Sequence, residues 1–247
     1  MHAVADGGPP ASRILQRRGN KGTRRRLRPA LLPLAGAVAE GERGGPEDSL
    51  MAMELAVRLP GRQLSDDDLW EIACANPELF FERSSEGELI VSPPTGSQTG
   101  SAEASLIRQL GNWNEGKRLG VVFSSVAGFT LANGAMRSPD AAWISTERWE
   151  FVPAADRGRF AHVCPEAIFE ILSPSDLPLQ AQKKVEEFIA NGASIGVLID
   201  PFTRVVEVHR PSRDVERCTR PRLALDPELP GFELDVLAVI DLANPPT

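Results

Sequence analysis

The amino-acid sequence predicts a mixed α/β domain in which helices pack on the faces of a β-sheet. Three features of the chain indicate this fold: a well-capped helix near the start of the regular structure, strand-like apolar runs in the middle, and a second amphipathic helix that leads into further strands. The 247 residues are 42% hydrophobic and 25% charged, which suits a domain with a sizeable core. No run approaches the ~20 consecutive apolar residues of a membrane span, so we expect no integral membrane protein.

The regular structure is expected to begin with a helix and a hairpin. Ser65 is a favourable N-cap, and the three aspartates after it suit the positive end of a helix dipole. This helix is expected to end at about Ala75. Two strands, 80–83 and 88–92, then flank a turn at 85–87.

A longer amphipathic helix is expected over 99–114, because Leu106, Leu110 and Trp113 recur at helical spacing. Strand-like segments follow it at 121–126, 128–131 and 137–144.

The centre of the sheet is predicted at 167–172, a short run that is apolar apart from Glu170. A second helix is expected over 179–191, with Gly192 as its C-cap. The last strands are expected at 195–199 and 204–210, followed by an edge strand formed by 229–232 with 234–236.

Residues 1–52 differ from the rest of the chain in composition. Within 1–50, nine Lys and Arg outnumber five Asp and Glu, a net charge of +4, whereas the remainder carries −11. The segment is rich in Gly, Pro, Ala and Arg and has no sustained hydrophobic period. We therefore expect a disordered basic extension over 1–52 and a folded domain over 53–247. A mis-assigned translation start, with Met51 or Met53 as the true one, is a second interpretation.

Several common catalytic motifs are missing from the sequence. It contains no P-loop, no GxGxxG fingerprint, no HExxH and no GxSxG elbow. The three scattered cysteines make neither a disulfide framework nor a CxxC zinc pair, which favours a reducing cytoplasm. His209 is expected to be an ordinary exposed strand residue.

Two carboxylates are the candidate site residues. Glu170 lies on a predicted buried strand, where an ionised carboxylate is costly unless it meets a cation, a metal ion or strong donors. A structural ion pair with an arginine, or a strand end open to water, explains it equally well. Asp140 follows Pro139 at the start of a predicted strand. If it faces a second acid on a neighbouring strand, the pair makes an oxygen site suited to Mg²⁺.

Lys184 is the third candidate. At about 100° per residue, it lies beside the apolar stripe of the helix over 179–191, and Lys183 lies almost opposite the stripe. Lys184 is therefore expected to turn toward the sheet and Lys183 toward solvent. Snorkelling beside the core is the alternative interpretation of Lys184. Glu186 and Glu187 are expected on a solvated face.

An Asp, a Glu and a Lys together suggest hydrolysis of a phosphodiester. The carboxylates would hold one or two Mg²⁺ ions, which polarise the phosphodiester and lower the pKa of a bound water. The lysine would orient or activate that water and offset the charge that develops on the phosphorus oxygens.

The pair Pro139-Asp140, followed by Glu170 on a hydrophobic strand, resembles the PD-(D/E)XK nuclease superfamily, which has the restriction-endonuclease-like fold. More narrowly, the chain is similar to the Uma family of restriction endonucleases over about residues 55–242. The stretches that carry this resemblance are Asn76-Pro77, Glu82-Arg83, 88–96, 137–140, 170–176, 184–188, 198–201 and 229–232.

The resemblance implies a sheet flanked by helices, a nuclease site that uses Mg²⁺ or Mn²⁺, and a homodimer. It implies that Asp140 and Glu170 are metal ligands. The superfamily's lysine normally stands two residues after the glutamate, where this chain has Leu172. In the Uma pattern the lysine comes from the next helix, where Lys184 matches. Glu103, early in the first core helix, is an additional candidate, although a solvated position is the favoured interpretation for it.

Two features depart from the expected pattern. Phe188 stands where the family usually has Tyr, so a hydroxyl is missing. The predicted domain is acidic overall, whereas binding to duplex DNA normally needs a basic footprint.

The leading functional hypothesis is a metal-dependent endonuclease that hydrolyses phosphodiester bonds of DNA. The alternative is a catalytically inactive relative that keeps the nuclease fold as a binding or assembly module. A hydrolase of small phosphorylated metabolites is a third hypothesis.

Overall fold

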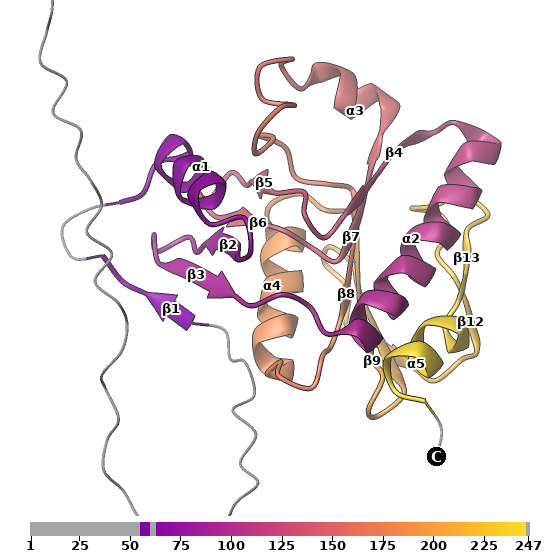
Figure 1. Cartoon of the computed structure of the whole chain (residues 1–247). Helices are drawn as coiled ribbons and strands as arrows, with labels where there is room; N and C mark the ends of the chain where they lie inside the picture. The colour runs from indigo at the N-terminus through magenta and orange to yellow at the C-terminus, as the bar shows by residue number, and fades with distance from the viewer. Residues whose placement is uncertain (1–54, 60–62, 246–247) are drawn as a thin grey trace, which may run out of the picture. The chain divides into compact units, whose positions relative to one another are not determined.

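The computed structural model describes residues 55–59 and 63–245. The extension expected over 1–52, with the start sites considered for it, lies outside the described residues. The helices of the described part are α1 (Asp66–Ala75), α2 (Ser97–Lys117), α3 (Thr146–Phe151), α4 (Pro178–Ala190) and α5 (Leu237–Ala243). Its strands form three sheets (Figure 1).

The larger sheet has six strands in the order β11-β10-β9-β8-β7-β4. These strands are β4 (Gly120–Ser124), β7 (Ala141–Ser145), β8 (Ala167–Ile171), β9 (Ile195–Asp200), β10 (Val205–His209) and β11 (Glu216–Cys218). Neighbouring strands are antiparallel except β8 and β9, which are parallel and joined through α4. Parallel neighbours need such a crossover. The apolar run around Glu170 is thus a central strand, as its composition predicted.

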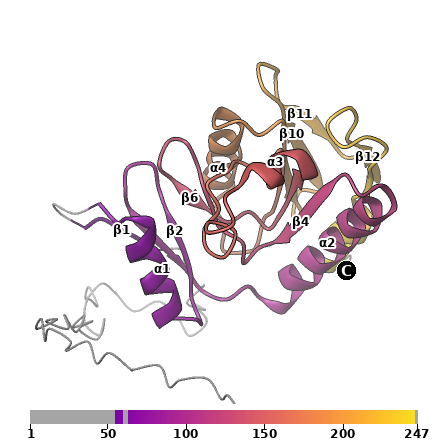
Figure 2. The same ribbon diagram turned by 90° about the horizontal axis from the view of Figure 1, so that it is seen from above.

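A smaller sheet of five strands has the order β1-β3-β2-β6-β5. Its strands are β1 (Leu55–Val57), β2 (Phe80–Arg83), β3 (Leu89–Ser92), β5 (Phe129–Thr130) and β6 (Met136–Arg137). The third sheet pairs β12 (Arg222–Ala224) with β13 (Glu233–Asp235). The small sheet and α1 lie on the other side of the large sheet from α2 and α5 (Figures 1 and 2).

The N-terminal helix forms where the sequence predicted it. The Ser65 hydroxyl accepts a hydrogen bond from the Asp68 amide at 3.1 Å, and the Asp68 side chain accepts one from the Ser65 amide, which completes a capping box. The buried Arg83 of β2 donates to the Leu64 carbonyl at 2.7 Å and to Asp66 at 2.6 Å. These contacts fasten α1 to the small sheet.

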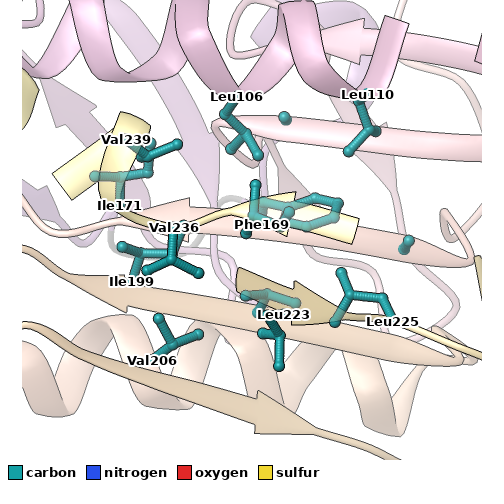
Figure 3. Packing of buried hydrophobic residues seen from close by; sticks show 14 of the residues in the cluster. Leu106, Leu110, Phe169, Ile171, Ile199, Val206, Leu223, Leu225, Val236 and Val239 are labelled. Atoms are coloured by element: carbon teal, nitrogen blue, oxygen red, sulfur yellow. The ribbon is translucent and has the colours of Figure 1, made fainter. Parts of the chain in front are cut away.

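Side-chain alternation gives the large sheet two cores. Phe169 of β8 faces α2 and α5, where it packs with Leu106 and Leu110 (Figure 3). The preceding residue, Ile168, faces α4 and packs with Phe188. Helices therefore cover both faces of a mixed sheet, as the sequence predicted.

The structure also differs from the predicted elements. The segment 137–144, expected as one strand, is interrupted at 138–140, so that β6 joins the small sheet and β7 the large one. Of the expected edge strand at 229–236, only the residues of β13 form a strand. The short elements α3, α5, β11 and β12 were not predicted, because each is too brief to show a period.

His209 was expected to be exposed and is buried, with 4% of its surface accessible. It lies on the face that α4 covers, beside Glu207, whose carboxylate accepts from Gln182 of α4 at 3.0 Å. The sequence of one strand does not reveal which neighbouring helix covers it.

Candidate active site

A cavity of about 1100 Å³ opens beside the N-terminal end of α4. Its lining combines β2 of the small sheet with the start of β7, the end of β8 and the first turns of α2 and α4. The candidates Asp140, Glu170, Lys184 and Glu103 all lie in this lining, together with Glu82, which the sequence had not singled out.

Asp140 immediately precedes β7, and Glu170 lies near the end of the neighbouring strand β8. The antiparallel register of β7 and β8 pairs Ala141 with Phe169, so one further residue places Asp140 across from Glu170. The Ile171 amide donates to Asp140 Oδ2 at 2.7 Å. Residues directly opposite in an antiparallel pair have Cβ atoms about 5 Å apart. The two acids therefore share one end of the sheet, as expected for a common oxygen site.

Glu170 is buried, with 8% of its surface accessible. Its Oε1 lies 3.0 Å from Lys184 Nζ, but this ion pair does not have hydrogen-bond geometry. Within the described part of the chain, no donor is directed at this buried oxygen. Because buried carboxylate oxygens normally have hydrogen-bond partners, Oε1, which has only the ion pair with Lys184, could also contact a metal ion.

Lys184 of α4 points toward the sheet, and Lys183 is exposed, as the helical spacing predicted. The Lys184 ammonium donates to the Ser138 carbonyl at 2.8 Å. It also lies 3.0 Å from Oε1 of Glu82 and 3.0 Å from Oε1 of Glu170. The ammonium therefore connects the two strands that carry the acids with the small sheet.

Glu103 of α2 is buried, with 7% of its surface accessible, so the expectation of a solvated position was wrong. It shares a face of α2 with Leu106 and Leu110, three and seven residues later, and this face packs on the sheet. Glu103 Oε2 accepts from the Ser125 hydroxyl at 3.0 Å. The chain thus adds a third carboxylate to the cavity.

Glu82 is the functional candidate that the sequence analysis missed. Its Oε1 accepts from the Ser138 amide at 2.7 Å and faces Lys184, and its Oε2 lies 3.2 Å from Arg137 Nη1. The partners of Glu82 are more than 50 residues away in the chain, so no local pattern identified them.

Glu187 also departs from its expected solvated position. Its Oε2 accepts from Arg137 Nε at 2.6 Å, and its Oε1 accepts from Asn133 at 2.8 Å. Glu186 is exposed as expected. The small sheet covers one side of α4, so only part of that helix face is in contact with solvent.

Burial sets the electrostatics of the cavity. It raises the pKa of Asp140 to about 7, with Lys184 opposing the rise and Glu103 adding to it. Burial also raises the pKa of Glu170 well above its ordinary value, and the charges of Asp140 and Glu82 reinforce this against Lys184. The pKa of Glu103 is raised by burial as well, although hydrogen bonds from Ser125 and Thr95 oppose the rise.

Two groups of the cavity are held in their charged forms. Burial alone would raise the pKa of Glu82, but Lys184 and Arg137 lower it below its ordinary value. Burial alone would lower the pKa of Lys184, but Glu170, Glu82 and Asp140 raise it well above its ordinary value. Several carboxylates thus share the Lys184 ammonium, and acidic side chains outnumber basic ones in the lining of the cavity.

The donor set fits Mg²⁺ or Mn²⁺. Asp140 and Glu170 offer oxygen ligands, and Oε1 of Glu170 has an ion pair with Lys184 but no hydrogen bond. Among the described residues, no group of three or more His, Cys, Asp and Glu side chains forms a complete metal site. Mg²⁺ does not require one, because it usually keeps several waters and binds through one or two carboxylates.

The described residues contain no helix that is both long and apolar enough to cross a membrane.

Known proteins resemble this chain in sequence or in fold. The model of the Uma2 family, with the description "putative restriction endonuclease", matches residues 66–237. No curated protein matches the chain. Among solved structures, a crystal structure titled as a putative nuclease from Anabaena variabilis aligns with a TM-score of 0.56 and 20% sequence identity. The alignment covers 66% of this chain and 90% of that one. At this identity the likeness shows a shared fold.

Proposed function

The chain belongs to the Uma2 family of putative restriction endonucleases, and on this premise we propose that it is a metal-dependent endonuclease that hydrolyses phosphodiester bonds of DNA. One observation carries the proposal: Asp140 and Glu170 lie across from each other at the ends of adjacent strands, and Lys184 reaches the same cavity. The ends of two neighbouring interior strands hold the two acids, which suits precise placement of a reacting group.

Asp140 and Glu170 would hold the metal ion in this proposal. When bound, Mg²⁺ or Mn²⁺ supplies Lewis acidity toward the phosphodiester and lowers the pKa of a water. The Ile171 amide orients Asp140 through its bond to Oδ2 and leaves Oδ1 for coordination. Glu103 lies in the same lining and adds negative charge that favours a cation there.

Lys184 would act as a fixed positive charge. Its raised pKa means that the ammonium stays protonated at neutral pH, so it does not take a proton from water. It donates hydrogen bonds instead, and a phosphate oxygen that gains charge in the transition state is a suitable acceptor.

The acidic lining explains why a divalent cation would be required for DNA to enter. Eight lining residues are acidic and three, Arg137, Lys183 and Lys184, are basic. Phosphates are repelled from such a surface at low ionic strength. A divalent cation on the buried acids offsets part of this charge, as it does for other phosphate-processing sites.

The test is a cleavage assay on supercoiled plasmid, linear duplex and single-stranded DNA in Mg²⁺, Mn²⁺ or EDTA. We expect metal-dependent cutting by the full chain and loss of cutting by at least about 100-fold in Asp140→Asn. Asp176→Asn is the matched control, because Asp176 lines the same cavity but is exposed and caps a local turn. Its cutting is expected to stay within about twofold of the unaltered chain.

The outcome that contradicts the proposal is an absence of cutting on every substrate together with an absence of Mn²⁺ binding by calorimetry. That result supports the inactive nuclease-fold module. Hydrolysis of a small phosphodiester without cleavage of DNA would instead support the small-metabolite hydrolase.

We also propose a cytoplasmic location, because Cys74, Cys164 and Cys218 are all free thiols.

A further inference from the structure

We propose that Glu82, carried by the small sheet, is a positioning residue that holds the Lys184 ammonium in place for the reaction. This inference rests on the proposed nuclease function and assigns to the small sheet a part in the catalytic site. The sequence comparison had matched Glu82-Arg83 to the family pattern without giving Glu82 a role.

Lys184 makes one hydrogen bond and two ion pairs. A lysine ammonium has three N–H groups. In this structure three oxygens surround it: the Ser138 carbonyl at 2.8 Å, Glu82 Oε1 at 3.0 Å and Glu170 Oε1 at 3.0 Å. Two of these oxygens, from Ser138 and Glu82, belong to residues outside the predicted set of Asp140, Glu170 and Lys184.

Glu82 and Ser138 form one unit that holds the lysine from two sides. The Ser138 amide donates to Glu82 Oε1 at 2.7 Å, and the Ser138 carbonyl accepts from Lys184. Pro139 follows Ser138 and limits the conformations of this segment. Because Asp140 is the next residue, Glu82 couples the position of Lys184 to that of a proposed metal ligand.

Glu82 is itself held by a second set of ion pairs. Its Oε2 lies 3.2 Å from Arg137 Nη1, and Arg137 Nε lies 2.6 Å from Oε2 of Glu187. Glu187 follows Lys184 by three residues on α4, so it lies on the same side of the helix. The contacts form a closed loop from α4 through the small sheet and back to α4. The side chains in it are 12–20% exposed, so solvent screens them little.

These contacts determine which side of the Lys184 ammonium can donate to a substrate. In the metal-free chain, one carbonyl oxygen and two carboxylate oxygens of the protein surround the ammonium. Once Glu170 serves as a ligand, the Ser138 carbonyl and the Glu82 carboxylate still hold the ammonium, and the side that faced Glu170 becomes available to a phosphate oxygen. Without Glu82, and with Glu170 serving as a ligand, the flexible four-carbon side chain of Lys184 would be held only by the neutral Ser138 carbonyl.

The test replaces Glu82 by an isostere without charge, Glu82→Gln, in the full chain. The matched control is Glu88→Gln, because Glu88 lines the same cavity but forms its ion pair with the exposed Arg58. The first measurement is the ¹⁵N NMR signal of the Lys184 ammonium in the metal-free protein. We expect a sharp, exchange-protected signal in the unaltered chain and in Glu88→Gln, and a broadened or lost signal in Glu82→Gln.

The second measurement is cleavage with calorimetry of Mn²⁺ binding. We expect kcat for Glu82→Gln to fall about 10–100-fold, with KM and the Mn²⁺ affinity within about threefold of the unaltered values. Glu82→Asp, which keeps the charge at shorter reach, is expected to regain part of both the NMR signal and kcat.

A Lys184 signal that is unchanged in Glu82→Gln would overturn the proposal, as would an unchanged kcat in an active enzyme. If the unaltered chain cuts no DNA, the nuclease function fails separately and the NMR comparison still decides the positioning. If Glu82→Gln does not fold, Glu187→Gln weakens the same loop at its outer end, and an unchanged Lys184 signal in that variant also overturns the proposal.

Discussion

The two faces of the large sheet have different roles, although neighbouring residues of the same strands build them. Phe169 points into a wholly apolar core under α2 and α5 (Figure 3), whereas Glu170, the next residue, points into the cavity beside α4. Strand alternation alone separates the two environments. The stabilising core and the buried charges of this fold therefore lie within one residue of each other, on opposite sides of one strand.

The two faces also differ in what their burial contributes. Burying apolar area stabilises the α2 face by about 25 cal/mol per Å². On the α4 face, Asp140 and Glu170 lose hydration and gain a single shared lysine in return. We therefore expect large substitution effects on both faces, but through different causes and with different dependence on pH.

The largest effect is expected on the apolar face. Phe169→Ala should lower the free energy of unfolding by about 3–5 kcal/mol, because the buried ring leaves a cavity that the neighbours fill only in part. Urea denaturation followed by fluorescence measures it. Phe151→Ala is the control, since Phe151 is 83% exposed and should change stability by less than about 0.5 kcal/mol. Equal effects from the two substitutions would mean that Phe169 does not anchor the core.

A smaller effect is expected from the charged face. Lys184→Met should lower the free energy of unfolding of the metal-free protein at pH 8 by up to about 3 kcal/mol, because it leaves buried carboxylates without their cation. Lys183→Met alters the exposed neighbour and should stay within about 0.5 kcal/mol. Chemical denaturation of both variants checks this pair. A stabilised Lys184→Met would show that the lysine does not compensate the acids.

The third effect, the smallest for a change of one pH unit, is a pH dependence that only the charged face produces. The pKa of Asp140 is about 7 in the folded chain and 3.8 by its ordinary value. Between these two pH values the folded state keeps a proton that the unfolded state releases. Stability of the metal-free protein should therefore fall as pH rises through this window, by about 1 kcal/mol per pH unit for this one group.

Asp140→Asn removes the titrating group, so its stability should depend less on pH over the same window. Phe169→Ala should retain the full pH dependence at its lower stability. Thermal melts from pH 4 to pH 8 compare the three proteins. If Asp140→Asn and the unaltered chain show the same slope, the carboxyl of Asp140 does not bind its proton more tightly in the folded state.

Part of the candidate site could be predicted from the sequence. Local periodicity was enough to distinguish Lys184 from Lys183, because a helix presents adjacent residues about 100° apart. The single acid in an apolar run identified Glu170, because burying an unpartnered carboxylate is costly. Pro139 and the strand after it located Asp140. The functional roles of these residues stay predictions.

Other parts of the site could not be predicted in this way. Glu103 and Glu187 looked solvated, and each is covered by an element that lies far away in the chain. Glu82 reaches Ser138 across 56 residues, through a sheet whose strand order no local pattern specifies. Long-range pairing depends on the sum of many packing contacts, so single positions carry little information about it.

Local sequence patterns were enough to predict the helix cap at Ser65, the central apolar strand, the side of α4 that faces the sheet, and the family to which the chain belongs. Each of these follows from residues close together in the chain, where propensity and periodicity act directly. The meeting of the two sheets at Lys184 depends on tertiary packing, which brings Glu82 of the small sheet and Glu170 of the large sheet to the same ammonium. Because these groups are buried, the protonation of each one depends on the charges of the others.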